Sequence, residues 1–123
     1  MQKLLTIFAL AASAVYAQDN AAPKSYINFW RVSVTALGAA NAMDIHSSWG
    51  KHELNSTLAG ANGTFGAQGA LIKLGLQGSL IGIEYLITRH HPSAKTYRAL
   101  GIVNFGAATG IAGVAAHNYS IPR

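Results

Sequence analysis

The chain has 123 residues, enough for one domain; it is 50% apolar and only 11% charged, whereas a soluble domain is about one-quarter charged. It has no cysteine, which excludes disulfides, a thiol nucleophile and a cysteine metal site. The formal charge is +5, but the basic residues are spread along the chain and not clustered beside aromatic readers. We therefore expect a lipid bilayer, and no nucleic acid, as a partner.

The first 17 residues have the layout of a secretory signal peptide. Lys3 supplies a positive charge, Leu4–Val15 is an apolar run too short to span a bilayer comfortably, and Ala17 is a small residue at the cleavage position. The sequence predicts a signal peptide over residues 1–17, cleaved after Ala17, and an exported linker over residues 18–26. An uncleaved anchor is the alternative interpretation.

Three apolar stretches of about 20 residues follow, each long enough as a helix to cross the roughly 30 Å hydrocarbon core. They are Tyr26–His46, Ala67–Thr88 and Tyr97–His117. Backbone polar groups in lipid must be bonded internally, so helices are the expected form. The sequence predicts an all-α fold, with a three-helix transmembrane bundle over residues 27–123 preceded by the signal peptide.

Each predicted helix also carries two small residues four positions apart, a spacing that lets backbones approach closely in lipid. The pairs are Gly38 and Ala42, Gly78 and Gly82, and Gly106 and Gly110. This pattern predicts a tightly packed bundle.

Charged residues in the first two stretches match in height when the stretches form an antiparallel hairpin. Asp44 then faces Lys73 and Arg31 faces Glu84, with registers that differ by about 3 Å along the helix axis. An unpaired charge in mid-bilayer costs at least about 2.5 kcal/mol, so we expect both pairs to form. Asn104 comes near the level of Glu84 if the third helix doubles back.

Lys73, Gln77 and Glu84 lie within about 40° of one another around the second helix and form one polar stripe. Lys73 and Glu84 are about 16 Å apart along the axis, so each needs a partner from another helix. Two interpretations stay open. The pairs either fix only the helix register, or they line a polar path or ligand pocket in which Glu84 or Asp44 titrates.

The sequence contains no recognised catalytic or metal-binding motif. Asp44, His46, His52 and Glu53 offer carboxylate and imidazole ligands in a short stretch, but their spacing matches no metal motif. The chain has no Gly-x-Ser-x-Gly, no phosphate-binding loop and no nucleophile with an obvious base. The sequence therefore predicts no enzymatic activity, no metal site and no cofactor.

The stretch Asp44–Asn55, followed by Lys73, resembles a domain-of-unknown-function family of small bacterial membrane proteins. That family has an Asp at the end of one spanning helix, a Ser/Thr pair, Glu-x-Asn-Pro, and a Lys in the next helix. The similarity covers residues 27–88, and Ser56 stands where the family has proline. The resemblance implies a multi-helix membrane protein without a known activity. It also implies a polar cluster at one membrane face, formed by Asp44, Ser48, Glu53, Asn55 and Lys73.

Two arguments disagree about orientation. Cleavage after Ala17 places the new N-terminus outside the cytoplasm and the 47–66 connection inside. The 89–98 connection carries three Lys or Arg residues and the 47–66 connection one, so the positive-inside rule favours the reverse. A soluble exported protein would remove the conflict.

Together these patterns predict a small integral protein of the bacterial inner membrane, exported through its N-terminal signal, with a structural or accessory role. Its expected partners are the bilayer and either further copies of itself or a larger membrane protein. One alternative is a membrane ion- or ligand-binding module that uses Asp44, Lys73, Glu84 and Asn104. The other is a soluble periplasmic helical protein. The candidate polar cluster comprises Arg31, Asp44, Ser48, Glu53, Asn55, Lys73, Glu84 and Asn104.

Overall fold

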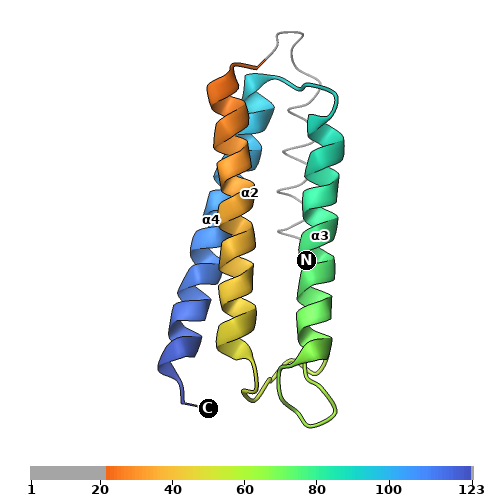
Figure 1. Cartoon of the computed structure of the whole chain (residues 1–123), viewed down its shortest axis with the longest axis vertical. Helices are drawn as coiled ribbons and strands as arrows, with labels where there is room; N and C mark the ends of the chain where they lie inside the picture. Colours follow the sequence, from red (N-terminus) through yellow and green to blue (C-terminus); the bar gives the residue numbers. More distant parts are fainter. Residues whose placement is uncertain (1–21, 123) are drawn as a thin grey trace.

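A computed structural model describes residues 22–122, and in that range the chain forms three helices and no strand (Figure 1). The helices are α2 (Lys24–Ser48), α3 (Ala67–Thr88) and α4 (Ala94–Ser120). The predicted all-α fold is confirmed for this part of the chain. The predicted signal peptide, 1–17, and the linker residues up to 21 lie outside the described residues.

The helices begin and end at residues that disfavour helical backbone. α2 starts directly after Pro23, and α4 ends shortly before Pro122. His91 has a positive φ of 51° and precedes Pro92, which together separate α3 from α4. The bounds of α3 match the predicted stretch, whereas α2 and α4 extend beyond theirs at both ends.

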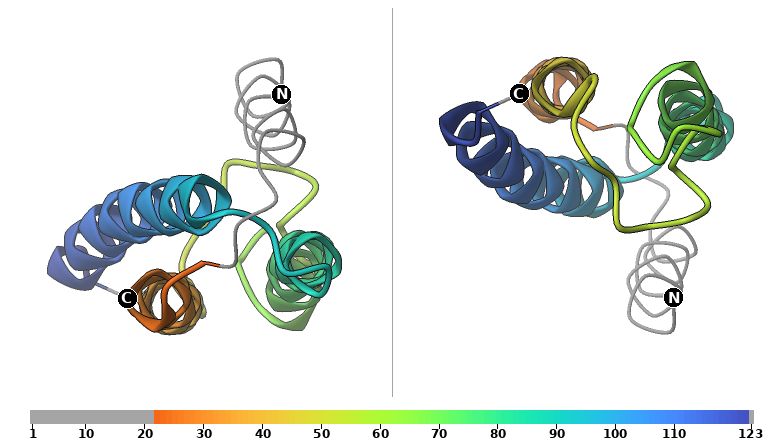
Figure 2. Two further views of the ribbon diagram at one scale, coloured as in Figure 1. Left: turned by 90° about the horizontal axis from the view of Figure 1, so that it is seen from above. Right: turned by 90° about the horizontal axis from the view of Figure 1, so that it is seen from below.

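The three helices are not packed evenly. α2 and α4 run in the same direction and pack along each other, while α3 runs the opposite way and stands apart (Figures 1 and 2). Leu37 and Ala40 of α2 form a small apolar core with Ala108 of α4. Near the start of α2, the ring of Phe29 lies 5.2 Å from that of Phe105.

The predicted tight packing through small-residue pairs is wrong for the pairs of α3 and α4. A Cβ built on Gly78, Gly82, Gly106 or Gly110 would meet no atom within 4 Å, because α3 stands off from its neighbours. On α2, a Cβ on Gly38 would make an ordinary contact with Nε2 of Gln77 on α3 (3.7 Å). The close approach in the α2–α4 interface is at Gly101 instead, where a Cβ would collide with the ring of Phe29.

The connection between α2 and α3 folds back on itself and closes one end of the bundle. The amide of Gly50 donates to the carbonyl of Phe65 (2.8 Å), and the amide of Phe65 donates to the carbonyl of Lys51 (2.8 Å). Phe65 is only 1% exposed and meets Trp49 edge to face, with ring centroids 6.4 Å apart. The connection is therefore an ordered structure that supports the start of α3.

Two of the described helices, α3 and α4, are long and apolar enough to cross a membrane. α2 has 25 residues, about 38 Å of helix, but it does not meet the same test. Lys24, Arg31 and Asp44, with several hydroxyl and amide side chains, reduce its apolarity. The prediction of three spanning helices is thus supported for two of them by length and composition.

Candidate functional site

Glu84 is the centre of a polar cluster to which all three helices contribute. This carboxylate on α3 is 4% exposed. Its Oε2 accepts hydrogen bonds from Nε1 of Trp30 on α2 (2.7 Å) and from Nδ2 of Asn104 on α4 (2.9 Å). The same Asn104 amide donates to Oγ of Ser33 (3.1 Å). The predicted proximity of Asn104 and Glu84 is confirmed.

The predicted pairing of Arg31 with Glu84 is wrong. No ion pair joins these two described residues, and Arg31 is exposed. Arg31 is thirteen positions from Asp44, which puts it about 140° away around α2, on the outer side of the helix. Arg31 was predicted because it is level with Glu84 along the helix axis. A residue of α2 must also lie on the face turned toward α3 to reach Glu84.

Sequence reasoning missed Trp30 and Ser33, the two α2 residues in this cluster. Both lie within about 40° of Asp44 around α2, at the height that faces Glu84. A test of helix face as well as height would therefore have found them.

Asp44 and Lys73 form the second polar centre, about 16 Å along α3 from Glu84. The Lys73 ammonium donates to Oδ2 of Asp44, and this is the only salt bridge within residues 22–122. The ammonium also lies 5.0 Å from the ring centroid of Phe65, at a distance that permits a cation–π interaction. The predicted pairing of Asp44 with Lys73 is confirmed.

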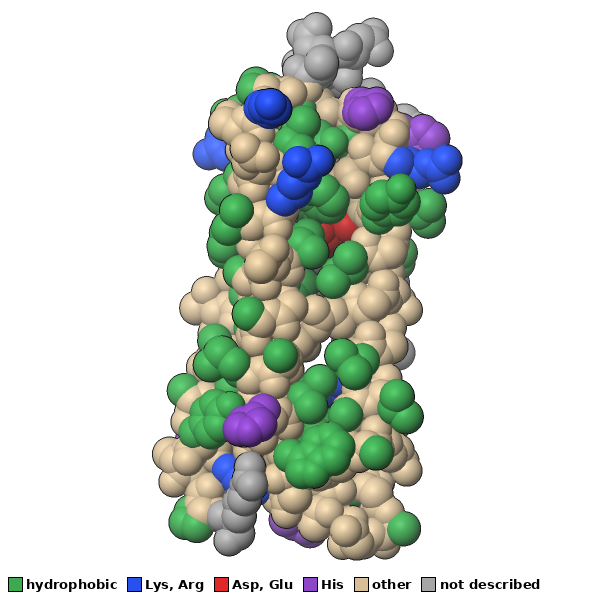
Figure 3. All heavy atoms as spheres, viewed as in Figure 1, with side chains coloured by type: hydrophobic (Ala, Val, Ile, Leu, Met, Phe, Trp, Pro, Cys, Tyr) green, Lys and Arg blue, Asp and Glu red, His purple; other side chains and the backbone are tan. Residues whose placement is uncertain are grey.

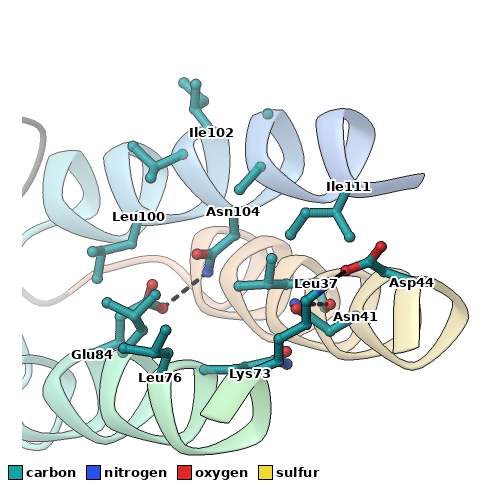
Figure 4. A pocket seen from close by; sticks show the side chains of 15 residues that line it. Leu37, Asn41, Asp44, Lys73, Leu76, Glu84, Leu100, Ile102, Asn104 and Ile111 are labelled. Carbon is teal, nitrogen blue, oxygen red and sulfur yellow. Dashed lines mark hydrogen bonds and ion pairs between the residues drawn. The ribbon is translucent and has the colours of Figure 1, made fainter. Parts of the chain in front are cut away.

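A cavity of about 610 Å³ lies between the three helices and connects the two polar centres (Figure 4). Asp44, Lys73, Glu84 and Asn104 all line it, and most of its remaining wall is aliphatic. The volume is within the range of known small-molecule sites, roughly 300–1,000 Å³. In the space-filling view, the acidic surface on this face is recessed between the helices (Figure 3).

A second cavity, of about 630 Å³, lies at the end of the bundle formed by the folded connection. The five residues that the family resemblance implies as a cluster all line it: Asp44, Ser48, Glu53, Asn55 and Lys73. Asp44 and Lys73 therefore belong to both cavities. The ion pair lies where the largely apolar first cavity meets the more polar second one.

Around this second cavity, α4 contributes contacts that sequence reasoning did not find. Asn118 donates through Nδ2 to Oγ of Ser48 (2.9 Å), and its carbonyl accepts a hydrogen bond from the Lys51 ammonium. Within the connection, Asn55 accepts the amide of Thr57 through Oδ1 (3.0 Å). The turn at Asn55 thus forms with Ser56 in the place of the family's proline.

The two cavities place carboxylate, ammonium and amide groups against apolar walls. Among residues 22–122, no three His, Cys, Asp or Glu side chains gather in a way that could hold a metal ion. Glu84 and Asp44 each use one carboxylate oxygen in a contact to another helix. The arrangement offers an apolar chamber with a polar group at each end.

Comparison with family models, curated proteins and solved structures found no match to this chain. The resemblance to the domain-of-unknown-function family stays a prediction.

Breaking the ion pair from one side is expected to destabilise the protein. Lys73→Met leaves the buried carboxylate of Asp44 without a counter-charge, which we expect to lower the free energy of unfolding by about 3–5 kcal/mol. Adding Asp44→Leu removes the orphaned charge and should restore much of that loss. The measurement is denaturant titration in detergent followed by circular dichroism.

The matched control is Lys95→Met, which removes an exposed ammonium at the start of α4 and should change stability little. If the double variant is no more stable than Lys73→Met alone, the ion pair does not tie α2 to α3.

Proposed function

We propose that this chain is a small integral membrane protein that binds a mostly apolar small ligand in the cavity between α2, α3 and α4. The proposal places it in a bacterial inner membrane, exported by its N-terminal signal, with all three helices crossing the bilayer. The observation that carries the binding role is the cavity of about 610 Å³ lined by Asp44, Lys73, Glu84 and Asn104.

The distribution of side chains supports a membrane environment. Polar residues are inside, since Asp44, Glu84 and Asn104 are all at most 6% exposed. Large apolar residues outside the cavity are exposed on α3, where Leu71 is 70% exposed and Leu86 55% exposed. Exposure of apolar surface to water is unfavourable by roughly 25 cal/mol per Å², whereas contact with lipid is not. This arrangement is favourable in a bilayer.

A spanning role for α2 follows from its partner. α2 packs along α4, runs in the same direction and contributes Trp30 and Asp44 to the polar contacts with α3. If α3 and α4 cross the membrane, α2 accompanies α4 across it. Its buried polar residues, Ser33 and Asp44, are then tolerated because they face the bundle interior, whereas Arg31 lies on the outer side about two turns from the start of the helix.

The gap between α3 and α4 supports entry from the bilayer. The cavity walls include outward residues of both helices, such as Leu76 on α3 and Ile102 and Gly106 on α4. Residues that line the cavity and also face outward mark an opening toward the acyl chains. A ligand dissolved in the membrane can then reach the chamber without crossing the polar end.

A structural or accessory role is the second candidate. Gly78 and Gly82 on α3 and Gly110 on α4 are exposed, with open space where a Cβ would be. In lipid, such small residues permit close contact between helices of different chains. A further copy of the chain or a larger membrane protein would then cover these faces.

Membrane integration is tested by washing membranes of expressing cells with alkaline carbonate. We expect the protein to stay in the pellet, because the outward apolar surface of α3 and α4 holds it in lipid. Intact mass of the same material measures the N-terminus and should begin at Gln18. Release into the supernatant would instead support the soluble exported alternative.

Ligand binding is tested by filling the cavity. Native mass spectrometry of the purified protein released from detergent should detect one 1-bromododecane per chain. Ala107→Trp places an indole in the cavity wall and should reduce this occupancy at least tenfold. Ala116→Trp, an exposed position on the same helix outside the cavity, is the control. Equal binding by the two variants would exclude this cavity as the site.

A further inference from the structure

Two buried oxygen atoms in the described part of the chain accept no hydrogen bond. They are Oδ1 of Asp44 and Oε1 of Gln77. Asp44 is 6% exposed as a residue, and its other oxygen is already held by Lys73. A buried acceptor without a donor is unfavourable, so an unpaired one in a folded protein needs an explanation.

Both atoms belong to residues that line the same cavity, from facing helices. Asp44 comes from α2, and Gln77 lies one turn after Lys73 on α3. The nearby amide of Asn41 donates through Nδ2 to the carbonyl of Leu37 (2.9 Å) and makes no hydrogen bond to either oxygen. The end of the cavity beside the ion pair, where Asp44 and Lys73 meet in Figure 4, is therefore bordered by two unpaired acceptors, which become available to an occupant when the two side chains turn toward the cavity.

The charges at this end favour a neutral occupant. The Lys73 ammonium and the Asp44 carboxylate compensate each other, so the site has no net charge to balance. An ammonium head group would lie beside the Lys73 ammonium, and like charges repel each other. A carboxylate or phosphate would face two acceptor oxygens with no donor of its own.

The other walls of the cavity are apolar. Leu37, Leu80, Leu100 and Ile111 extend the chamber away from the two acceptors. An occupant must therefore combine a small polar head with a hydrocarbon tail, because a polar tail would be desolvated without partners.

We propose that the cavity binds a neutral single-chain amphiphile whose head carries two O–H donors, one for Oδ1 of Asp44 and one for Oε1 of Gln77. A 1,2-diol on a hydrocarbon chain has this chemistry. The proposal rests on the binding function proposed above and names the ligand class for that site. It also assigns Gln77 as the residue that determines selectivity for the head group.

The test is competition against bound 1-bromododecane, measured by native mass spectrometry, with 1,2-dodecanediol, 1-dodecanol and dodecylamine as competitors. Each hydrogen bond gained should strengthen binding about fivefold. We therefore expect the diol to compete best, 1-dodecanol about fivefold less well, and dodecylamine worse than 1-dodecanol.

Gln77→Leu removes one acceptor while keeping the size of the side chain. It should weaken the diol about fivefold, to the level of 1-dodecanol, and leave 1-bromododecane binding unchanged. Retained 1-bromododecane binding also reports that the variant is folded. The matched control is Gln68→Leu, at an exposed position before the cavity on α3, which should leave the order of competitors intact.

The outcomes separate the two proposals. If diol, alcohol and 1-bromododecane bind equally well, the two acceptors do not select a head group, and the ligand class is wrong while the cavity still binds. If dodecylamine binds most tightly, the neutral head group is wrong. If 1-bromododecane itself does not bind the unmodified protein, the proposed binding function fails.

Discussion

The ion pair between Lys73 and Asp44 is the contact on which the rest of the arrangement depends. α3 has few backbone approaches to its neighbours, so side chains must fix its position. At one height the ion pair joins α3 to α2, and about 16 Å along the axis Glu84 joins α3 to both other helices. In the proposed bilayer, where no hydrophobic drive brings helices together, such polar contacts determine which faces meet.

Holding a helix at two heights has a structural consequence. Between the polar centres, α3 is free to stand away from α4, and the space that results is the cavity of about 610 Å³. The charged groups of Asp44, Lys73 and Glu84 thus fix the position of α3 and also lie at the two ends of the cavity. Because the ion pair also borders the second cavity, near the folded connection, it lies between a largely apolar compartment and a more polar one.

The sequence allowed the helices and the main ion pair to be predicted. Apolar stretches of membrane-spanning length located the helices, and matching heights in a hairpin located Asp44 opposite Lys73. The apolar stretches are local signals, and the ion pair depends only on the connection that reverses the chain between α2 and α3. Helical periodicity also places Arg31 about 140° from Asp44 around α2, on a side that does not face α3. Matching the heights of charged residues does not test for this.

Other features depend on the three-dimensional arrangement and have no local signal. The open space beside Gly78 and Gly106 depends on how the helices are placed, whereas the spacing of the small residues is equally compatible with packing inside the bundle. The same placement creates the cavity. The contacts of Asn118 with the α2 end require knowing that α4 runs beside α2 in the same direction. Matching residues between two neighbouring helices does not predict the distance between α3 and α4 or the direction of α4 beside α2.

The most direct test of the account is a dipolar-coupling measurement by solid-state nuclear magnetic resonance on labelled protein in bilayers. The account predicts a through-space coupling between Nζ of Lys73 and Cγ of Asp44, which disappears in Asp44→Ala. A missing coupling in the unmodified, folded protein would contradict it, because α3 would then be held by something other than this pair.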